Sequence, residues 1–138
     1  MSALRVLFVC TGNSARSQMA EALVNYKGKG RVHAESAGSR PASAVNPLAL
    51  ETLRLFGVPW SGRAPRSVDG LEQRPWDYVI TVCDRAKESC PIFPGRPAQA
   101  HWSLPDPHDA ADFRATFLEL SRRIDLLLAT LERPAGNA

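Results

Sequence analysis

The 138-residue sequence has three cysteines, few aromatic residues and no long hydrophobic run. Because three is an odd number and too few for a disulfide framework, we expect free thiols with reactive roles. No run approaches the roughly 20 apolar residues that a membrane helix needs, and the N-terminal apolar stretch is too short for a secretory signal. The sequence therefore predicts a cytoplasmic protein that has no membrane partner.

The sequence also lacks a large excess of either positive or negative charge. The net charge is +3, and the arginines are scattered along the chain instead of forming a basic run. This pattern predicts solvated surface arginines with a bias toward small anions, and no nucleic-acid partner. The cysteines lack the close spacing of a zinc site, so we expect no metal and no cofactor. The length predicts a single domain, residues 1–138, with a flexible tail at 134–138.

A complete strand–loop–helix unit is present near the N-terminus. The apolar run at 4–9 predicts a buried strand, and apolar residues recur at helical spacing from Arg16 to about Tyr26. The backbone N–H groups of a loop between such elements, together with the helix dipole, form an anion site. The predicted oxyanion-binding residues are Thr11, Gly12, Asn13, Ser14, Ala15, Arg16 and Ser17.

Cys10 stands at the start of this loop. Helix N-termini and arginines lower the pKa of a thiol, so we expect Cys10 to be a thiolate nucleophile. Arg16 lies six residues further on and can grip a tetrahedral oxyanion through two nitrogen atoms. The alternative is an inert, buried cysteine at a strand end. The agreement of strand, loop and helix favours the nucleophile.

The remaining pattern alternates strands and helices. Strands are predicted at 31–37, 77–83 and 99–103, helices at 47–56 and 110–132, and short helical turns at 68–73 and 84–89. This alternation predicts an open parallel sheet, in which ligands bind beyond the carboxyl ends of the strands. Cys10, Cys83 and Asp106 each follow a predicted strand, so we expect them to meet at one edge.

Six segments carry a recognisable combination of motifs: VLFVCTGNSARSQMAEA (6–22), ESAG (35–38), VNP (45–47), DYVITVCD (77–84), CP (90–91) and HWSLPDP (101–107). Together they resemble the thioredoxin-coupled arsenate reductases that are built on the low-molecular-weight tyrosine phosphatase fold. The resemblance implies an α/β protein of three layers. A four-stranded parallel sheet of flavodoxin-like architecture would carry helices on both faces.

The resemblance also implies residue roles. Cys10 would be the nucleophile toward arsenate, Arg16 the oxyanion clamp and Asp106 the general acid. Cys83 would then attack Cys10 and release arsenite, and Cys90 would move the disulfide outward, where thioredoxin reduces it. Residues seven apart on a helix are separated by about 10.5 Å of rise. Any helix between Cys83 and Cys90 must therefore unwind before the two cysteines can bond.

The polar residues around the loop receive implied roles as well. Asn13 would hold the loop open, and Ser17 would donate a hydrogen bond to the Cys10 thiolate. Some relatives bind potassium at positions that match Asn13, Glu21 and Ser36. The segment 62–67 here lacks the carboxylate that those relatives have. Glu21 is then equally well explained as a local hydrogen-bond partner.

Two other functions remain open at this stage. A tyrosine phosphatase of the same fold needs only Cys10, Arg16 and Asp106, and residual phosphatase activity is expected from the shared loop. It leaves Cys83 and Cys90 unexplained, and His108, not tyrosine, follows the Asp-Pro pair. A thiol-based binder of As(III) or soft metals would use the three cysteines but has no need of an arginine in an anion loop.

Overall fold

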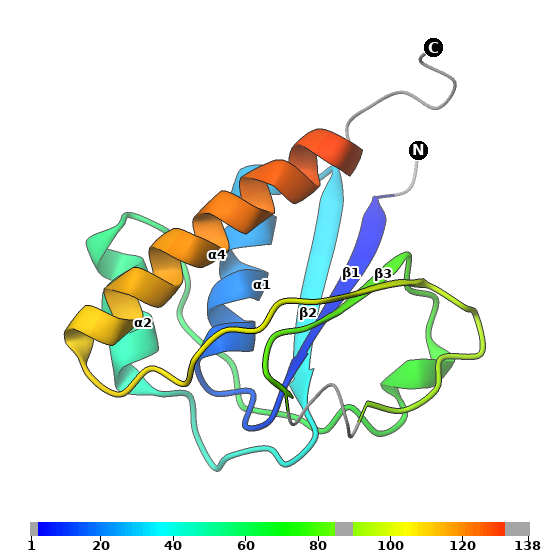
Figure 1. Ribbon diagram of the computed structural model, residues 1–138, viewed down its shortest axis with the longest axis horizontal. Coiled ribbons are helices and arrows are strands. Elements are labelled where there is room, and N and C mark those ends of the chain that lie inside the picture. The colour runs from blue at the N-terminus through cyan, green and yellow to red at the C-terminus, as the bar shows by residue number, and fades with distance from the viewer. Residues whose placement is uncertain (1–2, 85–89, 132–138) are drawn as a thin grey trace.

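A four-stranded parallel sheet forms the centre of the computed structural model, which describes residues 3–84 and 90–131 (Figure 1). The strands lie in the order β2-β1-β3-β4. Their bounds are Leu4–Cys10 for β1, Val32–Gly38 for β2, Tyr78–Thr81 for β3 and Ala98–His101 for β4. The predicted fold class is confirmed, although β3 and β4 are shorter than their apolar patterns indicated.

The helices follow the predicted order. Their bounds are Arg16–Gly28 for α1, Pro47–Leu55 for α2 and Ala110–Leu131 for α4, and a 3-10 helix, η1, spans Leu71–Gln73. Local chemistry explains the start of α2, because the Asn46 side chain accepts a hydrogen bond from the N–H of Leu48 and Pro47 occupies the first turn.

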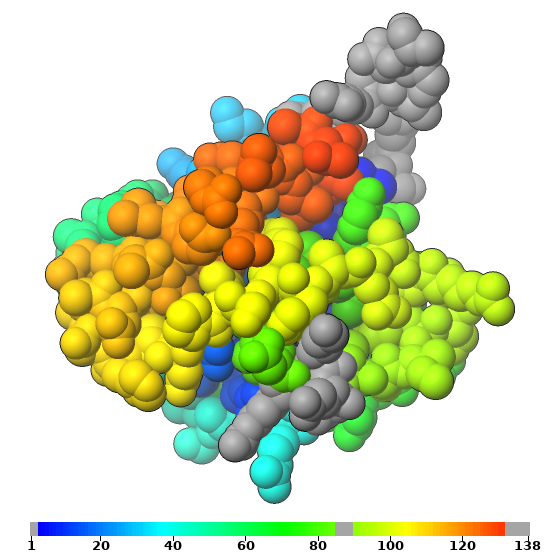
Figure 2. All heavy atoms as spheres, viewed as in Figure 1, coloured from blue at the N-terminus to red at the C-terminus, as the bar shows by residue number. Residues whose placement is uncertain are grey.

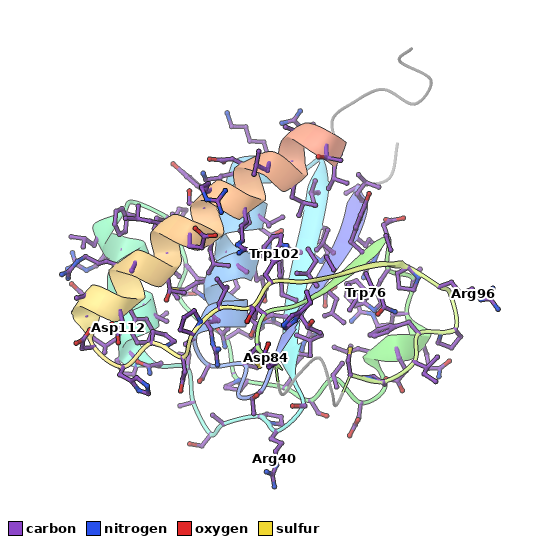
Figure 3. The ribbon with its side chains drawn as sticks, viewed as in Figure 1. Arg40, Trp76, Asp84, Arg96, Trp102 and Asp112 are labelled. Atoms are coloured by element: carbon purple, nitrogen blue, oxygen red, sulfur yellow. The ribbon has the colours of Figure 1, made fainter. Side chains whose placement is uncertain are left out.

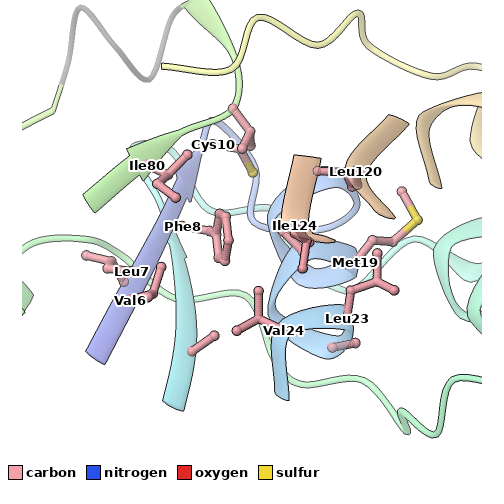
Figure 4. Close-up of a cluster of buried hydrophobic side chains, with 14 of the residues drawn as sticks. Val6, Leu7, Phe8, Cys10, Met19, Leu23, Val24, Ile80, Leu120 and Ile124 are labelled. Carbon is pink, nitrogen blue, oxygen red and sulfur yellow. The ribbon is translucent and has the colours of Figure 1, made fainter. Parts of the chain in front are cut away.

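The sheet is covered on both faces. The helices α1, α2 and α4 pack on one another on one side of it (Figure 1). Phe8 of β1 points into this layer, toward Met19 of α1 and Ile124 of α4, whereas Leu7 points to the other side (Figure 4). On that other side the Arg5 guanidinium lies 5.1 Å from the centre of the Trp76 ring, and the Trp76 indole donates to a carbonyl of η1.

The strand order places a topological switch point between β1 and β3. From β1 the chain crosses to β2 on one side, and β3 then pairs with the opposite edge of β1. Ligands of open parallel sheets bind at the carboxyl ends of the strands beside such a point. Cys10 is the last residue of β1, and Cys83 lies two residues after β3.

Two sequence predictions lie outside the described residues. They are the helical turns between 84 and 89, of which only Asp84 is described, and the flexible tail at 134–138. Within the described part of the chain, no helix has both the length and the apolar composition to span a membrane.

Candidate active site

A cavity of about 590 Å³ opens at the carboxyl ends of the strands. Three segments line it: the loop after β1, the residues after β3 and the segment after β4. The lining residues are Thr11, Arg16, Cys83, Asp84, Ser103, Leu104, Pro105 and Asp106. In Figure 2, blue atoms of the first segment are seen between the yellow segment after β4 and the cyan segment after β2. Asp84 lies at this edge of the sheet, whereas Arg40 projects away from the molecule (Figure 3).

Cys10 is buried at the base of the loop, with 3% of its surface exposed. Its Sγ lies 2.8 Å from Ser17 Oγ and accepts a hydrogen bond from the N–H of Asn13 at 3.1 Å. Burial raises the pKa of the Cys10 thiol, while the hydrogen bonds from Ser17 and Asn13 lower it. The net direction is upward, so the predicted lowering of this pKa is wrong. Loss of water around the sulfur outweighs the hydrogen bonds that it gains.

Arg16 begins α1 and faces the cavity. Its Nη1 donates to the carbonyl oxygen of Leu104 at 2.7 Å, and its Nη2 lies 3.5 Å from Asp106 Oδ1. The Asp106 side chain is 67% exposed at the rim. The arginine therefore links the anion loop to the segment after β4, and it holds Asp106 where an incoming molecule would pass.

Asn13 fixes the shape of the loop. Its backbone is in the left-handed region with φ of 52°, and its amide nitrogen donates to Ser17 Oγ at 2.9 Å and Ser36 Oγ at 2.8 Å. The backbone N–H of Arg66 donates to the amide oxygen of Asn13 at 3.0 Å. No acceptor among the described residues binds the backbone N–H groups of Gly12, Ser14 and Ala15. These groups are free to bind an oxyanion.

The three cysteines do not all meet. Cys83 is buried beside the loop, with its Sγ 3.1 Å from Thr11 Oγ1, and a charge on it raises the pKa of Cys10. Cys90 is half-buried in a different cavity of about 220 Å³, which Thr81 and His101 also line. Burial raises the pKa of the Cys90 thiol. All three are free thiols, so the structure brings Cys10 and Cys83 to one place and leaves Cys90 apart.

Two buried carboxylates have arginine partners that the sequence did not predict. Arg63, Arg66 and Arg74 are among the arginines predicted to be solvated, but Arg63 pairs with Glu21, and the other two pair with Glu35. The sequence signal for these pairs was the presence of two carboxylates, Glu21 and Glu35, on elements that are otherwise buried. A buried carboxylate needs a partner of opposite charge, and the arginine-rich segment after α2 supplies one for each.

A guanidinium contacts Glu21 and Ser36, two of the residues considered above for potassium. The Arg63 Nη2 bonds to Glu21 Oε1, and it lies 3.3 Å from the Ser36 carbonyl oxygen and 3.2 Å from Ser36 Oγ. A guanidinium therefore already contacts the oxygens that an alkali cation would use, so these residues do not fit a bound potassium ion. In the described ranges, no three His, Cys, Asp or Glu side chains gather as a metal site.

The chain is similar to a known family model and to two curated proteins. A family model described as low molecular weight phosphotyrosine protein phosphatase matches residues 5–136. An arsenate reductase of Halalkalibacterium halodurans is 32% identical over 133 residues, which cover 91% of this chain and 95% of that protein. Arsenate reductase 2 of Staphylococcus haemolyticus is 36% identical over 102 residues, covering 74% of this chain and 77% of that protein.

A solved structure is similar over most of the chain. The thioredoxin-dependent arsenate reductase of Corynebacterium glutamicum superimposes with a TM-score of 0.80 at 34% identity. The match covers 95% of this chain and 63% of the corynebacterial chain. The present chain thus spans less than two thirds of that protein's length.

Proposed function

The chain belongs to the arsenate reductases of the low molecular weight phosphotyrosine protein phosphatase family, and on that premise we propose that it reduces arsenate to arsenite through Cys10, Cys83 and Cys90. One observation carries the proposal. Two free thiols flank one oxyanion loop: Cys83 lines the cavity, and Cys10 is buried at the base of the loop, close enough to Cys83 for a charge there to raise its pKa. A hydrolase needs the Cys10 thiol only, whereas a reductase needs both.

In the first step arsenate binds to the free N–H groups of the loop and to Arg16. The Cys10 thiolate attacks As(V), one As–O bond breaks, and the oxygen leaves as water after it takes a proton from Asp106. Ser17 stabilises the thiolate because its hydroxyl lies 2.8 Å from the sulfur. The exposed position of Asp106 at the rim fits proton exchange with solvent.

In the second step the Cys83 thiolate attacks Cys10 Sγ. An S–S bond forms, and the S–As bond breaks with its electron pair moving to arsenic. As(V) is thereby reduced to As(III), which leaves as arsenite, and the two thiols are oxidised. The Thr11 hydroxyl at 3.1 Å from Cys83 Sγ supplies a hydrogen bond to the attacking sulfur.

In the third step the Cys90 thiolate attacks Cys83 Sγ, which frees Cys10 and leaves a Cys83–Cys90 disulfide. Because Cys90 lines a different cavity from Cys83, the two sulfur atoms must approach each other for this step. A dithiol of the thioredoxin type then reduces the disulfide. Free thiols and such a reductant coexist in a reducing compartment such as the cytoplasm.

A phosphatase is the second candidate. Of its minimal groups, Arg16 and Asp106 line the cavity, and Cys10 is buried at the base of the adjoining loop. None of the eight described residues that line the cavity is aromatic, so no ring is available to pack against a phosphotyrosine side chain. The lining therefore favours a small oxyanion, and we expect slow hydrolysis of aryl phosphates as a side activity.

The decisive experiment measures arsenate-dependent NADPH oxidation in the presence of thioredoxin and thioredoxin reductase. Wild type should turn over, whereas Cys83→Ser and Cys90→Ser should not, and both variants should still hydrolyse p-nitrophenyl phosphate. Cys90→Ser should also accumulate a Cys10–Cys83 disulfide after one turnover, visible by mass spectrometry. If wild type cleaves the ester but reduces no arsenate with any thiol donor, the protein is a phosphatase.

A variant of Arg16 separates arsenate turnover from As(III) binding when both are measured. Replacing Arg16 with Met removes the oxyanion clamp and leaves all three thiols in place. We expect this variant to lose arsenate turnover and to bind arsenite as wild type does. Equal turnover in the Arg16→Met variant would show that the loop does not hold the substrate.

A further inference from the structure

A buried carboxylate lies next to the anion loop, and an arginine is its counter-ion. Glu21 of α1 is 5% exposed. It accepts hydrogen bonds from the Ser36 hydroxyl at 2.6 Å and from Arg63 Nη2. Removing a buried carboxylate from water is costly unless a positive charge and hydrogen bonds compensate. Arg63 provides that charge from a segment more than 40 residues away in the sequence.

Backbone contacts hold Arg63 in position. Gln18 Nε2 donates to the carbonyl oxygen of Arg63 at 2.7 Å, and the Arg63 N–H donates to Gln18 Oε1 at 3.2 Å. The Arg63 Nε is buried and has no hydrogen-bond partner within residues 3–84 and 90–131. Only Nη2 makes contacts with Glu21 and Ser36. The side chain therefore acts there as a point of positive charge, not as a planar fork.

A continuous chain of hydrogen bonds leads from this charge to the Cys10 sulfur. The Arg66 N–H donates to Asn13 Oδ1, which fixes the amide so that its NH₂ group faces Ser17 and Ser36. Both serine hydroxyls accept from this NH₂ group, so each must direct its own proton away from Asn13. Ser36 donates to Glu21. The Ser17 proton is left to point toward Cys10 Sγ, which lies 2.8 Å from the Ser17 hydroxyl.

We propose that Arg63 is a built-in cation of the active site, a positioning residue that makes the enzyme independent of monovalent metal ions. It neutralises Glu21, which keeps Glu21 an acceptor for Ser36 and so keeps Asn13 and Ser17 oriented toward the sulfur. The inference rests on the proposed function in one respect, the reactivity of Cys10.

The same geometry predicts the effect of removing Arg63. Glu21 Oε1, Ser36 Oγ and the Ser36 carbonyl oxygen would then surround an empty space. Oxygen ligands that include a carboxylate suit a hard cation. The Arg63 side chain is 28% exposed, so a small ion can reach this space from solvent. A variant without the guanidinium should therefore bind potassium, and wild type should not.

The test compares wild type, Arg63→Met and Arg63→Lys. Each is assayed for p-nitrophenyl phosphate hydrolysis and for alkylation of Cys10 by iodoacetamide, in potassium, sodium or choline chloride at one ionic strength. The control is Arg54→Met, because Arg54 pairs with Glu51 on the exposed surface of α2. Wild type and the control should be equally active in the three salts.

Arg63→Met should lose about 10- to 100-fold of kcat/KM in choline, the usual effect of removing a group that orients an active site. Potassium should raise the kcat/KM of this variant at least tenfold over its value in choline. It should also raise the melting temperature of this variant only, because an ion that binds the folded state stabilises it. Arg63→Lys keeps the charge and should keep most of the activity in choline.

Three results would overturn the inference. They are activation of wild type by potassium, full activity of Arg63→Met in choline, and a loss in Arg63→Met that no monovalent cation reduces. If Arg63→Met does not fold, Arg63→Met combined with Glu21→Gln removes both charges. That double variant should fold and ignore potassium, and potassium dependence in it would contradict the inference. Failure of the proposed function is distinguishable, because wild type would then reduce no arsenate, whereas ester hydrolysis and Cys10 alkylation would still report the salt dependence of each variant.

Discussion

At Cys10 two physical effects oppose each other. Burial raises the pKa of the thiol, and hydrogen bonds from Ser17 and the Asn13 backbone lower it. The thiolate fraction of Cys10 near neutral pH therefore depends on these hydrogen bonds. Arg16 contributes little to this balance, because it bonds to Leu104 and Asp106 and not to the sulfur.

Replacing Ser17 with Ala should raise the pKa of Cys10 further, since it removes one of the groups that favour the charged form. The alkylation rate at pH 7 should fall, and the rise of that rate with pH should shift to higher pH. Ser67→Ala is the control, because its hydroxyl caps a turn at Asp69. An unchanged pH profile in Ser17→Ala would show that this hydroxyl does not donate to the sulfur.

Glu35 is the second residue whose charge matters. Burial raises its pKa, but hydrogen bonds from Arg66 and His33 and the nearby charge of Arg74 lower it from 4.5 to about 2. Because the folded-state pKa lies below the unfolded value, the stabilisation is complete above about pH 4.5 and is lost as pH falls toward 2. Glu35→Gln should lower the free energy of unfolding at pH 7 by about 1 to 2 kcal/mol, after allowance for screening of the exposed arginines.

Urea denaturation of wild type and Glu35→Gln between pH 2 and 7 measures this difference. The difference between the two should shrink toward the acid end of the range, because about half of wild-type Glu35 is protonated at pH 2. Glu119→Gln is a suitable control, since Glu119 also has a pKa lowered to about 2 by hydrogen bonds from Arg122 and Arg123, but its side chain is more exposed than that of Glu35. A difference between wild type and Glu35→Gln that stays constant down to pH 2 would contradict the assignment.

At the scale of elements, the end of β2 supports the loop after β1. A Cβ atom on Gly38 would lie 2.5 Å from the Thr11 carbonyl oxygen and 3.1 Å from the Asn13 nitrogen, so only glycine allows this approach. The chain after β2 also holds the loop from outside, since the N–H groups of Arg40, Ala42 and Asn46 donate to loop carbonyls.

Gly38→Ala should therefore displace the loop. We expect about 1 to 3 kcal/mol of destabilisation from overpacking and about a 100-fold loss of kcat/KM, because a displacement near 1 Å disturbs attack geometry. Melting curves and p-nitrophenyl phosphate assays measure the two effects. Gly95→Ala is the matched control, as a Cβ atom there would meet no atom within 4 Å and the φ of Gly95 is not positive. Equal activity of both variants would show that the position of the loop does not depend on glycine at residue 38.

At the scale of the whole molecule, oxyanion binding is coupled to folding. The loop after β1 receives contacts from segments after β2, β3 and β4, so an anion in it stabilises only the folded chain. Phosphate at ten times its dissociation constant should add about 1.4 kcal/mol of stability. The melting temperature should rise with phosphate in wild type and rise less in Arg16→Met at the same ionic strength. Equal shifts in both proteins would indicate binding elsewhere.

The sequence alone was sufficient for the parts of this protein that rest on local patterns. Hydrophobic periodicity located β1, α1 and α4, and alternation of strands and helices implied a parallel sheet. Because parallel strands end at one edge, chain order predicted that Cys83 and Asp106 line one opening and that Cys10 ends the neighbouring strand. Asn46 and Pro47 likewise marked the start of α2 through chemistry within one turn.

Only the tertiary structure decided which distant groups became partners. Arg63 and Arg66 lie in an irregular segment without hydrophobic periodicity, so no pattern tied them to Glu21 and Glu35, from which they are separated by 42 and 31 residues. The position of Cys90 beside β3 and β4, away from Cys83, is equally non-local. The direction of the Cys10 pKa depends on how completely other segments exclude water from it. Burial and long-range pairing depend on how the whole chain packs, so a local sequence pattern does not predict them.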